Sequence, residues 1–388
     1  MSEVKISNDI LYIGVNDKTL DLFESQYKVT NGVSYNSYII LDEKVTVMDT
    51  VDKRASKEWL ANLELARNGR TVDYLVVSHM EPDHAANIQV LAEKFPDMKV
   101  IGNAKTFTMI SQFFDLDLSD RSITVKEGDT ISLGAHQLQF LMAPMVHWPE
   151  VMVAYESTEK ILFSADGFGK FGTLDTKECW EEEAHRYFMN ILGKYGQSVQ
   201  TLLKKVAPLD IKTICPLHGP VLNENLAFYL DKYDKWSTYQ MEDGVVIAYA
   251  SIHGNTGNVA RKMAEILTDM GQKNVIVRDL SRDDISEVVT KAFQYSNLIV
   301  AAATYDMGLF PCMEDFLLHL RAKHYHNHKV GIIENGSWAP KAGACMKAIL
   351  EQMKGLEISE EIVTIKSSLK SENMEQLRAL ASWISNNS

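Results

Sequence analysis

The stretch that decides the fold reads Ser78-His79-Met80-Glu81-Pro82-Asp83-His84, and it follows directly on the apolar run from Tyr74 to Val77. That run has the composition of a buried β-strand. Four side chains that commonly bind metal ions therefore stand within six residues at the end of one strand, namely His79, Glu81, Asp83 and His84. Such a concentration of imidazoles and carboxylates predicts a metal site.

Three more candidate ligands follow other apolar runs, at His147, Asp166 and His218. A single His or Asp in such a place is usually a hydrogen-bonded surface residue. Seven together are costly to bury without a ligand, so we expect these strand ends to converge on two metal ions with Asp166 as the bridging carboxylate. Zinc prefers nitrogen and sulfur ligands, whereas carboxylates mixed with imidazoles suit non-haem iron, and Glu81 therefore favours iron.

The chain divides into two parts with different sequence patterns. Up to about residue 240, short apolar runs end in polar or titratable residues, and helical patterns lie at 56–67, 86–95 and 180–206. After Gly244, five apolar strands alternate with amphipathic helices, which is typical of a parallel sheet covered on both faces. These strands are expected at 245–250, 275–277, 298–303, 330–334 and 361–365. We therefore predict one domain at residues 1–243 and a second at residues 244–388.

The second part carries a predicted phosphate site between its first strand and its first helix. Backbone N–H groups at a helix N-terminus and short polar side chains suit a phosphate dianion. The residues expected there are Ser251, His253, Gly254, Asn255, Thr256, Gly257 and Asn258. Two later strand ends would complete the pocket with Thr304, Tyr305, Asp306, Asn335, Gly336, Ser337 and Trp338. Tyr305 and Trp338 are either packing aromatics or the walls of a flavin site, and the pattern favours FMN.

These motifs resemble the metallo-β-lactamase superfamily, whose zinc members usually show H-x-H-x-D-H, and specifically its flavodiiron branch, which shows H-x-E-x-D-H. The resemblance covers essentially the whole chain. It implies an α/β protein with an N-terminal metallo-β-lactamase-like αββα sandwich. A C-terminal flavodoxin-like domain with a doubly wound, five-stranded parallel sheet would follow it.

The resemblance also implies roles for single residues. His79, Glu81, His147 and the bridging Asp166 correspond to ligands of one iron, and Asp83, His218 and Asp166 to ligands of the other. His84 occupies a position that ligates in some members and turns away in others. Tyr195 resembles a pocket tyrosine that hydrogen-bonds a bound diatomic gas, although a tyrosine in such a helical stretch also packs without any such role.

The activity implied is the reduction of dioxygen to water, of nitric oxide to nitrous oxide, or of both, at a non-haem di-iron centre fed by FMN. Rubredoxin or a reduced deazaflavin would donate the electrons, and a head-to-tail homodimer or tetramer is expected. Two alternatives stay open. One is a zinc-dependent hydrolase of the same superfamily with an attached flavodoxin domain, and the other is a noncatalytic electron carrier or gas sensor.

Composition narrows the partners and the compartment. A net charge of −13 disfavours nucleic acid, and no apolar run reaches the eighteen residues that a membrane span needs. The four cysteines are widely spaced and form no Cys-x-x-Cys pair, so a cytoplasmic protein with reduced thiols is expected. We interpret the run from His324 to His328 as an exposed connector and not as a metal site.

Overall fold

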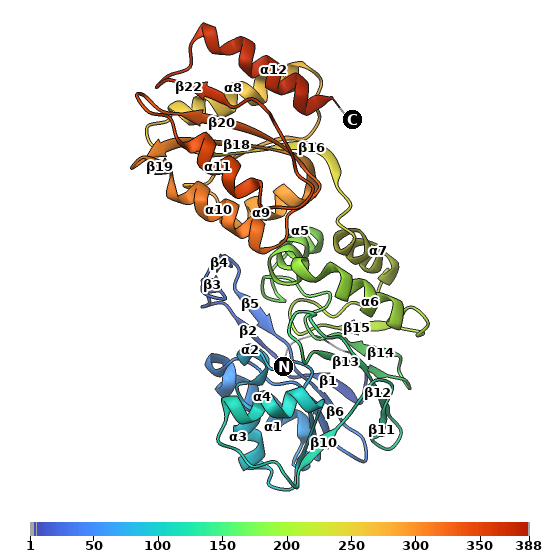
Figure 1. Ribbon diagram of the computed structural model, residues 1–388. Helices are drawn as coiled ribbons and strands as arrows, with labels where there is room; N and C mark the ends of the chain where they lie inside the picture. The colour runs from blue at the N-terminus through green and yellow to red at the C-terminus, as the bar shows by residue number, and fades with distance from the viewer. Residues whose placement is uncertain (1–3, 5, 387–388) are drawn as a thin grey trace. The chain divides into compact units, whose positions relative to one another are not determined.

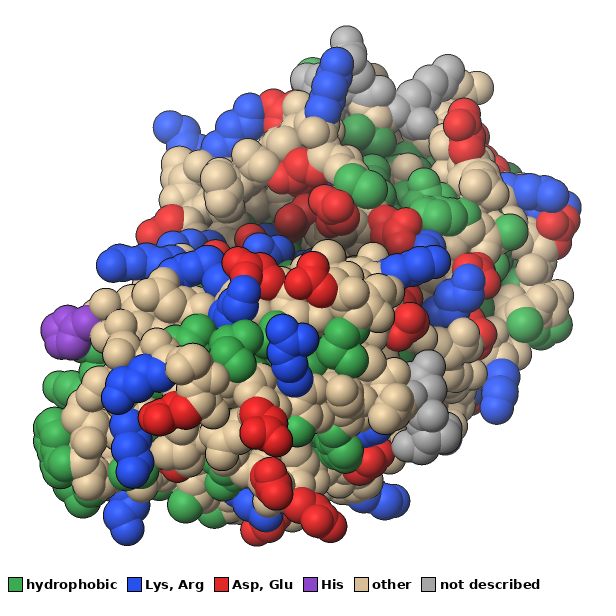
Figure 2. Space-filling model, turned by 90° about the horizontal axis from the view of Figure 1, so that it is seen from above, with side chains coloured by type: hydrophobic (Ala, Val, Ile, Leu, Met, Phe, Trp, Pro, Cys, Tyr) green, Lys and Arg blue, Asp and Glu red, His purple; other side chains and the backbone are tan. Residues whose placement is uncertain are grey.

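The computed structural model describes Val4 and residues 6–386. The chain separates into two compact units, Met1–Thr238 and Tyr239–Ser388. Figure 1 shows both units as layers of sheet and helix. No helix of the described residues is long and apolar enough to cross a membrane. On the face drawn in Figure 2, acidic and basic side chains of the described residues are interspersed and form no single basic region.

Two sheets form the centre of the N-terminal unit. The first has the strand order β1-β6-β7-β8-β9-β10 and the second the order β11-β12-β13-β14-β15. The strands of the first sheet are β1 (Ile10–Tyr12), β6 (Tyr38–Ile40), β7 (Thr46–Met48), β8 (Tyr74–Val76), β9 (Lys99–Gly102) and β10 (Ser122–Thr124). Those of the second are β11 (Thr130–Ser132), β12 (Gln137–Met142), β13 (Met152–Glu156), β14 (Ile161–Phe163) and β15 (Thr213–Cys215). Two small hairpins add β2 (Val15–Asp17), β3 (Leu22–Phe23), β4 (Tyr27–Lys28) and β5 (Val33–Tyr35).

The two sheets pack face to face. One apolar cluster contains residues of both, including Ile40 and Val76 from the first sheet and Phe140 and Phe163 from the second. Helices α1 (Ser56–Arg67), α3 (Ile88–Lys94) and α4 (Ala104–Phe113) lie together on one side of the sandwich, and α6 (Gly196–Val206) and α7 (Leu226–Ser237) lie together on the other (Figure 1). The remaining helices are η1 (Lys53–Ala55), α2 (Pro82–Ala85), α5 (Trp180–Tyr187), η2 (Phe188–Leu192) and η3 (Gly193–Tyr195). This arrangement is the αββα sandwich predicted from the sequence.

The C-terminal unit has a parallel sheet with the order β17-β16-β18-β20-β21. Its strands are β16 (Glu242–Ala250), β17 (Val275–Asp279), β18 (Tyr295–Tyr305), β20 (Lys329–Asn335) and β21 (Glu357–Ile358). The fifth position is shared by β21 and β22 (Val363–Ile365), which both pair with β20 in parallel, so the predicted strand at 361–365 is shorter than expected. A two-residue strand, β19 (Gly308–Leu309), turns back antiparallel onto β18.

Helices cover both faces of this sheet. Helices α8 (Asn255–Asp269) and α12 (Met374–Ser385) pack together on one face, and α9 (Ile285–Gln294), α10 (Pro311–Ala322) and α11 (Ala342–Leu350) lie on the other (Figure 1). A short turn, η4 (Ser371–Asn373), precedes α12. The central strands β16, β18 and β20 are almost entirely buried, which explains their continuous apolar sequences. The flavodoxin-like order predicted from the sequence is confirmed.

Candidate functional site

The predicted metal ligands lie together at strand ends of the N-terminal unit. His79 and Glu81 follow β8, and Pro82 then starts the short helix α2, which carries Asp83 and His84. His147 lies in the loop after β12, and Asp166 and His218 follow β14 and β15. The seven side chains form two groups of potential ligands, and within each group the ligand atoms lie within 4.8 Å of one another: His79, Glu81, His147 and Asp166 in the first, and Asp83, His84 and His218 in the second.

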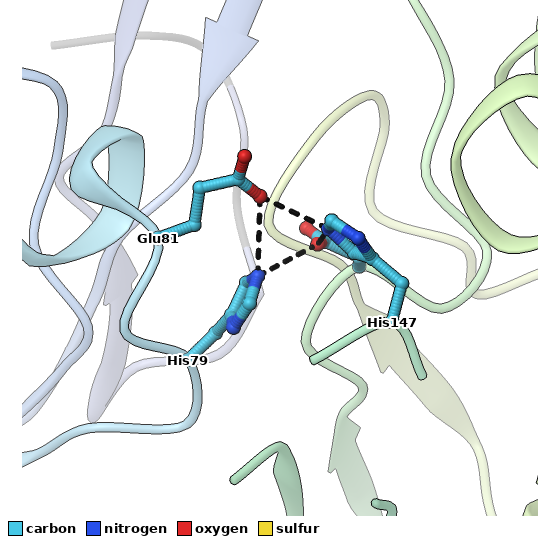
Figure 3. A group of neighbouring side chains, drawn as sticks. His79, Glu81 and His147 are labelled. Atoms are coloured by element: carbon cyan, nitrogen blue, oxygen red, sulfur yellow. Dashed lines mark hydrogen bonds and ion pairs between the residues drawn. The ribbon is translucent and has the colours of Figure 1, made fainter. Parts of the chain in front are cut away.

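The first group is built around the carboxylate of Glu81. Its Oε2 lies 2.9 Å from Nε2 of His147 and 3.2 Å from Nε2 of His79. Figure 3 shows these three side chains pointing toward one another, with His79 and Glu81 on one segment and His147 on another. Two imidazole nitrogens and a carboxylate oxygen thus face a common point.

The second group is built around His84 and His218. Their Nε2 atoms lie 3.1 Å apart, and Oδ2 of Asp83 is 3.4 Å from the first and 3.2 Å from the second. His84 therefore turns its Nε2 toward the other candidate ligands. The sequence left its orientation open, and the structure settles that question while its role as a ligand stays a proposal.

Asp166 connects the two groups. Its Oδ2 lies 3.3 Å from Nε2 of His147, and its Oδ1 lies 3.3 Å from Nε2 of His84. One oxygen of the same carboxylate faces each group, which is the arrangement that a bridge between two metal ions requires.

The charges of the cluster demand cations. Burial lowers the pKa of the His147 imidazole, but the carboxylates of Asp166 and Glu81 outweigh burial and raise that pKa to about 9. Burial raises the pKa of the Asp166 carboxyl, but His147 and His84 outweigh it and hold that pKa well below its usual value. The carboxylate oxygens of Asp83 and Asp166 are buried and accept no hydrogen bond among the described residues. Buried carboxylate oxygens that accept no hydrogen bond, next to imidazole nitrogens, are typical ligands of a di-metal site. The set of side chains therefore fits two iron ions.

The structure also shows neighbours of the candidate ligands that the sequence did not predict. Glu150 is fully buried, and its Oε1 lies 2.8 Å from Nδ1 of His79. Nδ1 of His218 lies 2.8 Å from the backbone oxygen of Ser34. Each contact fixes the ring so that Nε2 faces the cluster. The acidic residue at the end of the HWPE stretch was the available signal for Glu150.

A tyrosine that the sequence analysis did not single out, Tyr187, packs against the cluster. Tyr195 is half-buried at the end of η3, and Nζ of Lys194 lies 5.9 Å from the centroid of its ring. Tyr187, at the end of α5, is fully buried, its ring centroid lies 5.6 Å from that of His218, and its hydroxyl has no hydrogen-bond partner among the described residues. Burial, reinforced by Asp166 and Asp83, raises the pKa of the Tyr187 hydroxyl well above its usual value, so the group stays protonated. The role of Tyr195 near a bound gas stays untested, whereas Tyr187 has the better position for it.

Comparisons with known proteins match this geometry. A model of the ODP family beta lactamase matches residues 33–219, the part that carries all seven candidate ligands. An anaerobic nitric oxide reductase flavorubredoxin of Vibrio vulnificus is 29% identical over 86% of this chain and 70% of that protein. An uncharacterized protein of Methanocaldococcus jannaschii is 29% identical over 96% of this chain and 95% of its own length. The rubredoxin:oxygen oxidoreductase of Desulfovibrio gigas superposes with a TM-score of 0.92 at 26% identity, covering 98% of this chain and 97% of that one.

The chain resembles flavodiiron proteins over nearly its whole length. The flavodiiron protein of Giardia intestinalis, with a TM-score of 0.89 and 23% identity over 98% of this chain and 97% of that one, shares the fold. The family carries FMN together with a di-iron centre, and both cofactors have a matching site in this chain.

The candidate flavin site is a cavity of about 640 Å³ in the C-terminal unit. Most residues predicted for FMN line it, at the carboxyl ends of β16, β18 and β20: Ser251, His253, Asn255, Thr256, Thr304, Tyr305, Asp306, Asn335, Gly336, Ser337 and Trp338. The sequence analysis missed Ile252, Ala303, Met307, Ala339 and Ser367, which line it as well. A cavity at the carboxyl ends of parallel strands is the usual ligand site of such a sheet.

Three predicted FMN residues are outside this lining. Gly254 adopts a positive φ of 85° immediately before α8, where the chain turns sharply into the helix. Gly257 lies on α8 against the ring of Tyr249, so that an added Cβ would come within 2.9 Å of that ring. Asn258 accepts a hydrogen bond from Arg261. These residues shape the turn and the helix, and their direct contact with FMN stays a prediction.

The cavity fits a phosphate and a flat ring. The buried hydroxyl of Ser251 has no partner among the described residues, and the backbone at the start of α8 opens toward the same cavity. Tyr305 and Trp338 stand at the rim, and 88% of the Trp338 side chain is exposed. An exposed indole at the rim of the cavity is available to stack on an isoalloxazine ring.

The histidine run near the end of α10 differs from expectation in one respect. His324 is exposed, but His328 is buried and stacks on Tyr325 with 4.0 Å between ring centroids. Its Nδ1 donates to the backbone oxygen of His326. Burial lowers the pKa of the His328 imidazole to about 4, so His328 is a neutral core residue and the run is not simply a solvated connector.

Proposed function

We propose that this protein reduces dioxygen, nitric oxide or both at the di-metal cluster, with electrons that arrive through FMN. The observation that carries the proposal is Asp166, which directs one oxygen to each of two ligand groups. The names of two similar proteins support this function: one is a rubredoxin:oxygen oxidoreductase and the other is an anaerobic nitric oxide reductase flavorubredoxin. The turnover experiment with each gas measures which gas the chain prefers.

The candidate ligands divide the work of holding two irons. His79, Glu81 and His147 would hold one ion, and Asp83, His84 and His218 the other, with Asp166 between them. When bound, the irons supply redox-active, open positions for a diatomic gas, and FMN supplies single electrons. Glu150 holds His79 in the orientation that presents Nε2, and the Ser34 carbonyl does the same for His218.

Tyr187 is the proposed hydrogen-bond donor to the reacting gas. Its hydroxyl is buried, protonated and unpartnered among the described residues, and the carboxylates of Asp166, Asp83 and Glu81 all act on it. A donor kept free in a dry site is worth more than one in water, because no solvent competes for it.

A separate electron donor is proposed, either rubredoxin or a reduced deazaflavin, because one similar solved structure is a rubredoxin:oxygen oxidoreductase. We also propose a head-to-tail dimer or tetramer. Exposed apolar side chains beside both cavities support it, with Trp338 and Met307 next to the flavin cavity and Phe113 and Val90 next to a second cavity beside α2. Work in the cytoplasm is proposed as well, since all four cysteines are free thiols.

Turnover tests the function. Protein loaded with iron and FMN and supplied with reduced rubredoxin should consume nitric oxide, dioxygen or both over many cycles, followed with gas electrodes. Failure to consume either gas would leave the carrier or sensor alternative. The zinc-hydrolase alternative is tested by metal analysis of protein purified without added metal, where two irons per chain support reduction and two zincs support hydrolysis.

A further inference from the structure

A second cluster of potential metal ligands lies in the N-terminal unit and shares no residue with the di-iron cluster. It contains Asp9, His136 and Glu159. Asp9 immediately precedes β1 of the first sheet, His136 immediately precedes β12 of the second, and Glu159 lies in the turn between β13 and β14. The cluster therefore joins the start of β1, the edge strand of the first sheet, to strand ends of the second sheet.

The imidazole of His136 is the centre of this cluster. The residue is only 4% exposed, and its Nε2 points at two carboxylate oxygens, 3.9 Å from Oδ2 of Asp9 and 4.0 Å from Oε1 of Glu159. Both distances are too long for a hydrogen bond. Nδ1, on the other side of the ring, forms no hydrogen bond to a described residue, although a carboxylate lies beside it. The imidazole is buried and faces two carboxylates without a hydrogen bond to either. An ion between Nε2 and the two carboxylates would satisfy all three groups.

A third carboxylate lies behind the ring. Glu156 is fully buried, and its Oε1 is 3.2 Å from Nδ1 of His136. Backbone N–H groups of Thr158 and Glu159 donate to Glu156 at 2.8 and 2.7 Å, which holds the carboxylate in place. A negative charge on this side favours the proton on Nδ1, so Nε2 presents its lone pair to Asp9 and Glu159.

The charges around His136 are unbalanced. Three carboxylates, those of Asp9, Glu156 and Glu159, surround one imidazole, and among the described residues no Lys or Arg lies within ion-pair distance of them. Among the described residues, the only side chain that donates a hydrogen bond to Glu159 is Ser7, through its neutral hydroxyl. A divalent cation would offset most of this negative charge.

We propose that Asp9, His136 and Glu159 bind a divalent cation, zinc in the first instance, with Glu156 orienting the imidazole. Zinc binds imidazole nitrogen and carboxylate oxygen at about 2.0–2.2 Å, so two donor atoms at a tetrahedral angle on one ion lie about 3.4 Å apart. The carboxylates of Asp9 and Glu159 lie 3.9 and 4.0 Å from Nε2, so each would close by about half an ångström on the ion. Three protein ligands leave a fourth position for water. The ion would link the start of β1 to the turns of the second sheet and so stabilise the sandwich.

Zinc binding to the iron-loaded and FMN-loaded protein tests the proposal. After equilibrium dialysis against buffered zinc, the wild type should hold about one zinc per chain, with its iron retained, that His136→Gln does not hold. Asp9→Asn should weaken zinc binding by about tenfold or more, and because 59% of Asp9 is exposed this change cannot unfold the core. His324→Gln, at an exposed histidine, should bind zinc like the wild type.

Cobalt(II) provides a second readout that does not depend on activity. Its d–d absorption should appear in the iron-loaded wild type and in His324→Gln, and it should be lost in His136→Gln. Equal zinc and equal cobalt absorption in the wild type, His136→Gln and Asp9→Asn would overturn the proposal, as would a wild type that binds neither metal. Because none of the seven di-iron candidates is altered, this outcome is independent of gas reduction.

Discussion

Nδ1 of His79 lies 2.8 Å from Oε1 of Glu150, and the same oxygen accepts the backbone N–H of Met80 at 2.8 Å. One buried carboxylate thus fixes both the ring and the backbone at the start of the metal-binding stretch. A carboxylate behind a metal-binding imidazole sets its tautomer and makes its other nitrogen a better ligand. Glu150 therefore acts through His79 and not on the gas.

Glu150→Gln should weaken iron binding by about 10-fold to 100-fold while the fold is kept. Gln fills the same volume but removes the charge that holds the imidazole. The measurement is the iron retained per chain after dialysis against a graded series of chelator concentrations. Glu93→Gln, at an exposed position on α3, is the control and should match the wild type. Equal iron retention by Glu150→Gln and Glu93→Gln would contradict the claim that Glu150 strengthens iron binding through His79.

Glu81→His should shift the metal preference of the first group from iron toward zinc. The change replaces the carboxylate that faces His79 and His147 by a third imidazole, and zinc favours nitrogen ligands. Metal analysis after refolding in equimolar iron(II) and zinc measures the preference. An unchanged iron-to-zinc ratio would contradict the argument that Glu81 selects iron.

Tyr187→Phe should lower turnover about tenfold, the worth of one lost hydrogen bond in a dry site, without lowering the free energy of unfolding. Stability should be kept because the hydroxyl has no partner among the described residues. Tyr195→Phe should leave turnover nearly unchanged. If Tyr195→Phe slowed the reaction and Tyr187→Phe did not, the tyrosine predicted from the sequence would be the right one.

Trp338→Ala should raise the dissociation constant of FMN by about 3-fold to 10-fold, which corresponds to a stacking energy of about 0.5–1.5 kcal/mol. Because the indole is 88% exposed, its removal should not change the folding of the unit. Fluorescence titration of the FMN-free protein measures the affinity. Leu65→Ala, at an exposed apolar residue of the other unit, is the control, and an equal loss of affinity there would exclude a specific contact.

His328 should make the C-terminal unit sensitive to acid. In the folded protein, burial lowers the pKa of the His328 imidazole to about 4, whereas a histidine in the unfolded chain has a pKa of about 6.5. The unfolded chain therefore binds more protons between these values, so the stabilisation is complete above pH ~6.5 and is lost as the pH falls toward ~4, by roughly 3 kcal/mol in all.

Urea unfolding between pH 7 and pH 4.5 tests this dependence. The midpoint for the wild type should fall more steeply with acidification than the midpoint for His328→Asn. His324→Asn, which changes an exposed neighbour, should follow the wild type. Parallel curves for the wild type and His328→Asn would show that His328 is not the group responsible.

The sequence predicts those parts of the site that depend on local order. Titratable residues that directly follow apolar strands reveal the candidate ligands, since a strand and its end are adjacent in the chain. The parallel strands of the C-terminal unit are predictable for the same reason, because β16, β18 and β20 are buried on both faces and read as continuous apolar runs.

What the sequence does not predict depends on long-range packing. Glu150 is 71 residues from His79, and only the pairing of β12 with β13 brings the HWPE loop back to the end of β8. Tyr187 was missed because its ring meets His218, which follows β15, through tertiary packing that no local pattern in α5 marks.

The most direct test of the account is the rate at which nitric oxide oxidises the reduced FMN of the protein, followed by anaerobic stopped-flow absorbance. Iron-loaded protein should reoxidise its flavin rapidly with formation of nitrous oxide, whereas zinc-loaded protein with the same FMN content should remain reduced. Dioxygen should give a corresponding iron-dependent rate if it is the preferred gas. Equal flavin oxidation rates in the iron-loaded and zinc-loaded proteins with both gases would contradict the claim that the cluster built around Asp166 is where the gas is reduced.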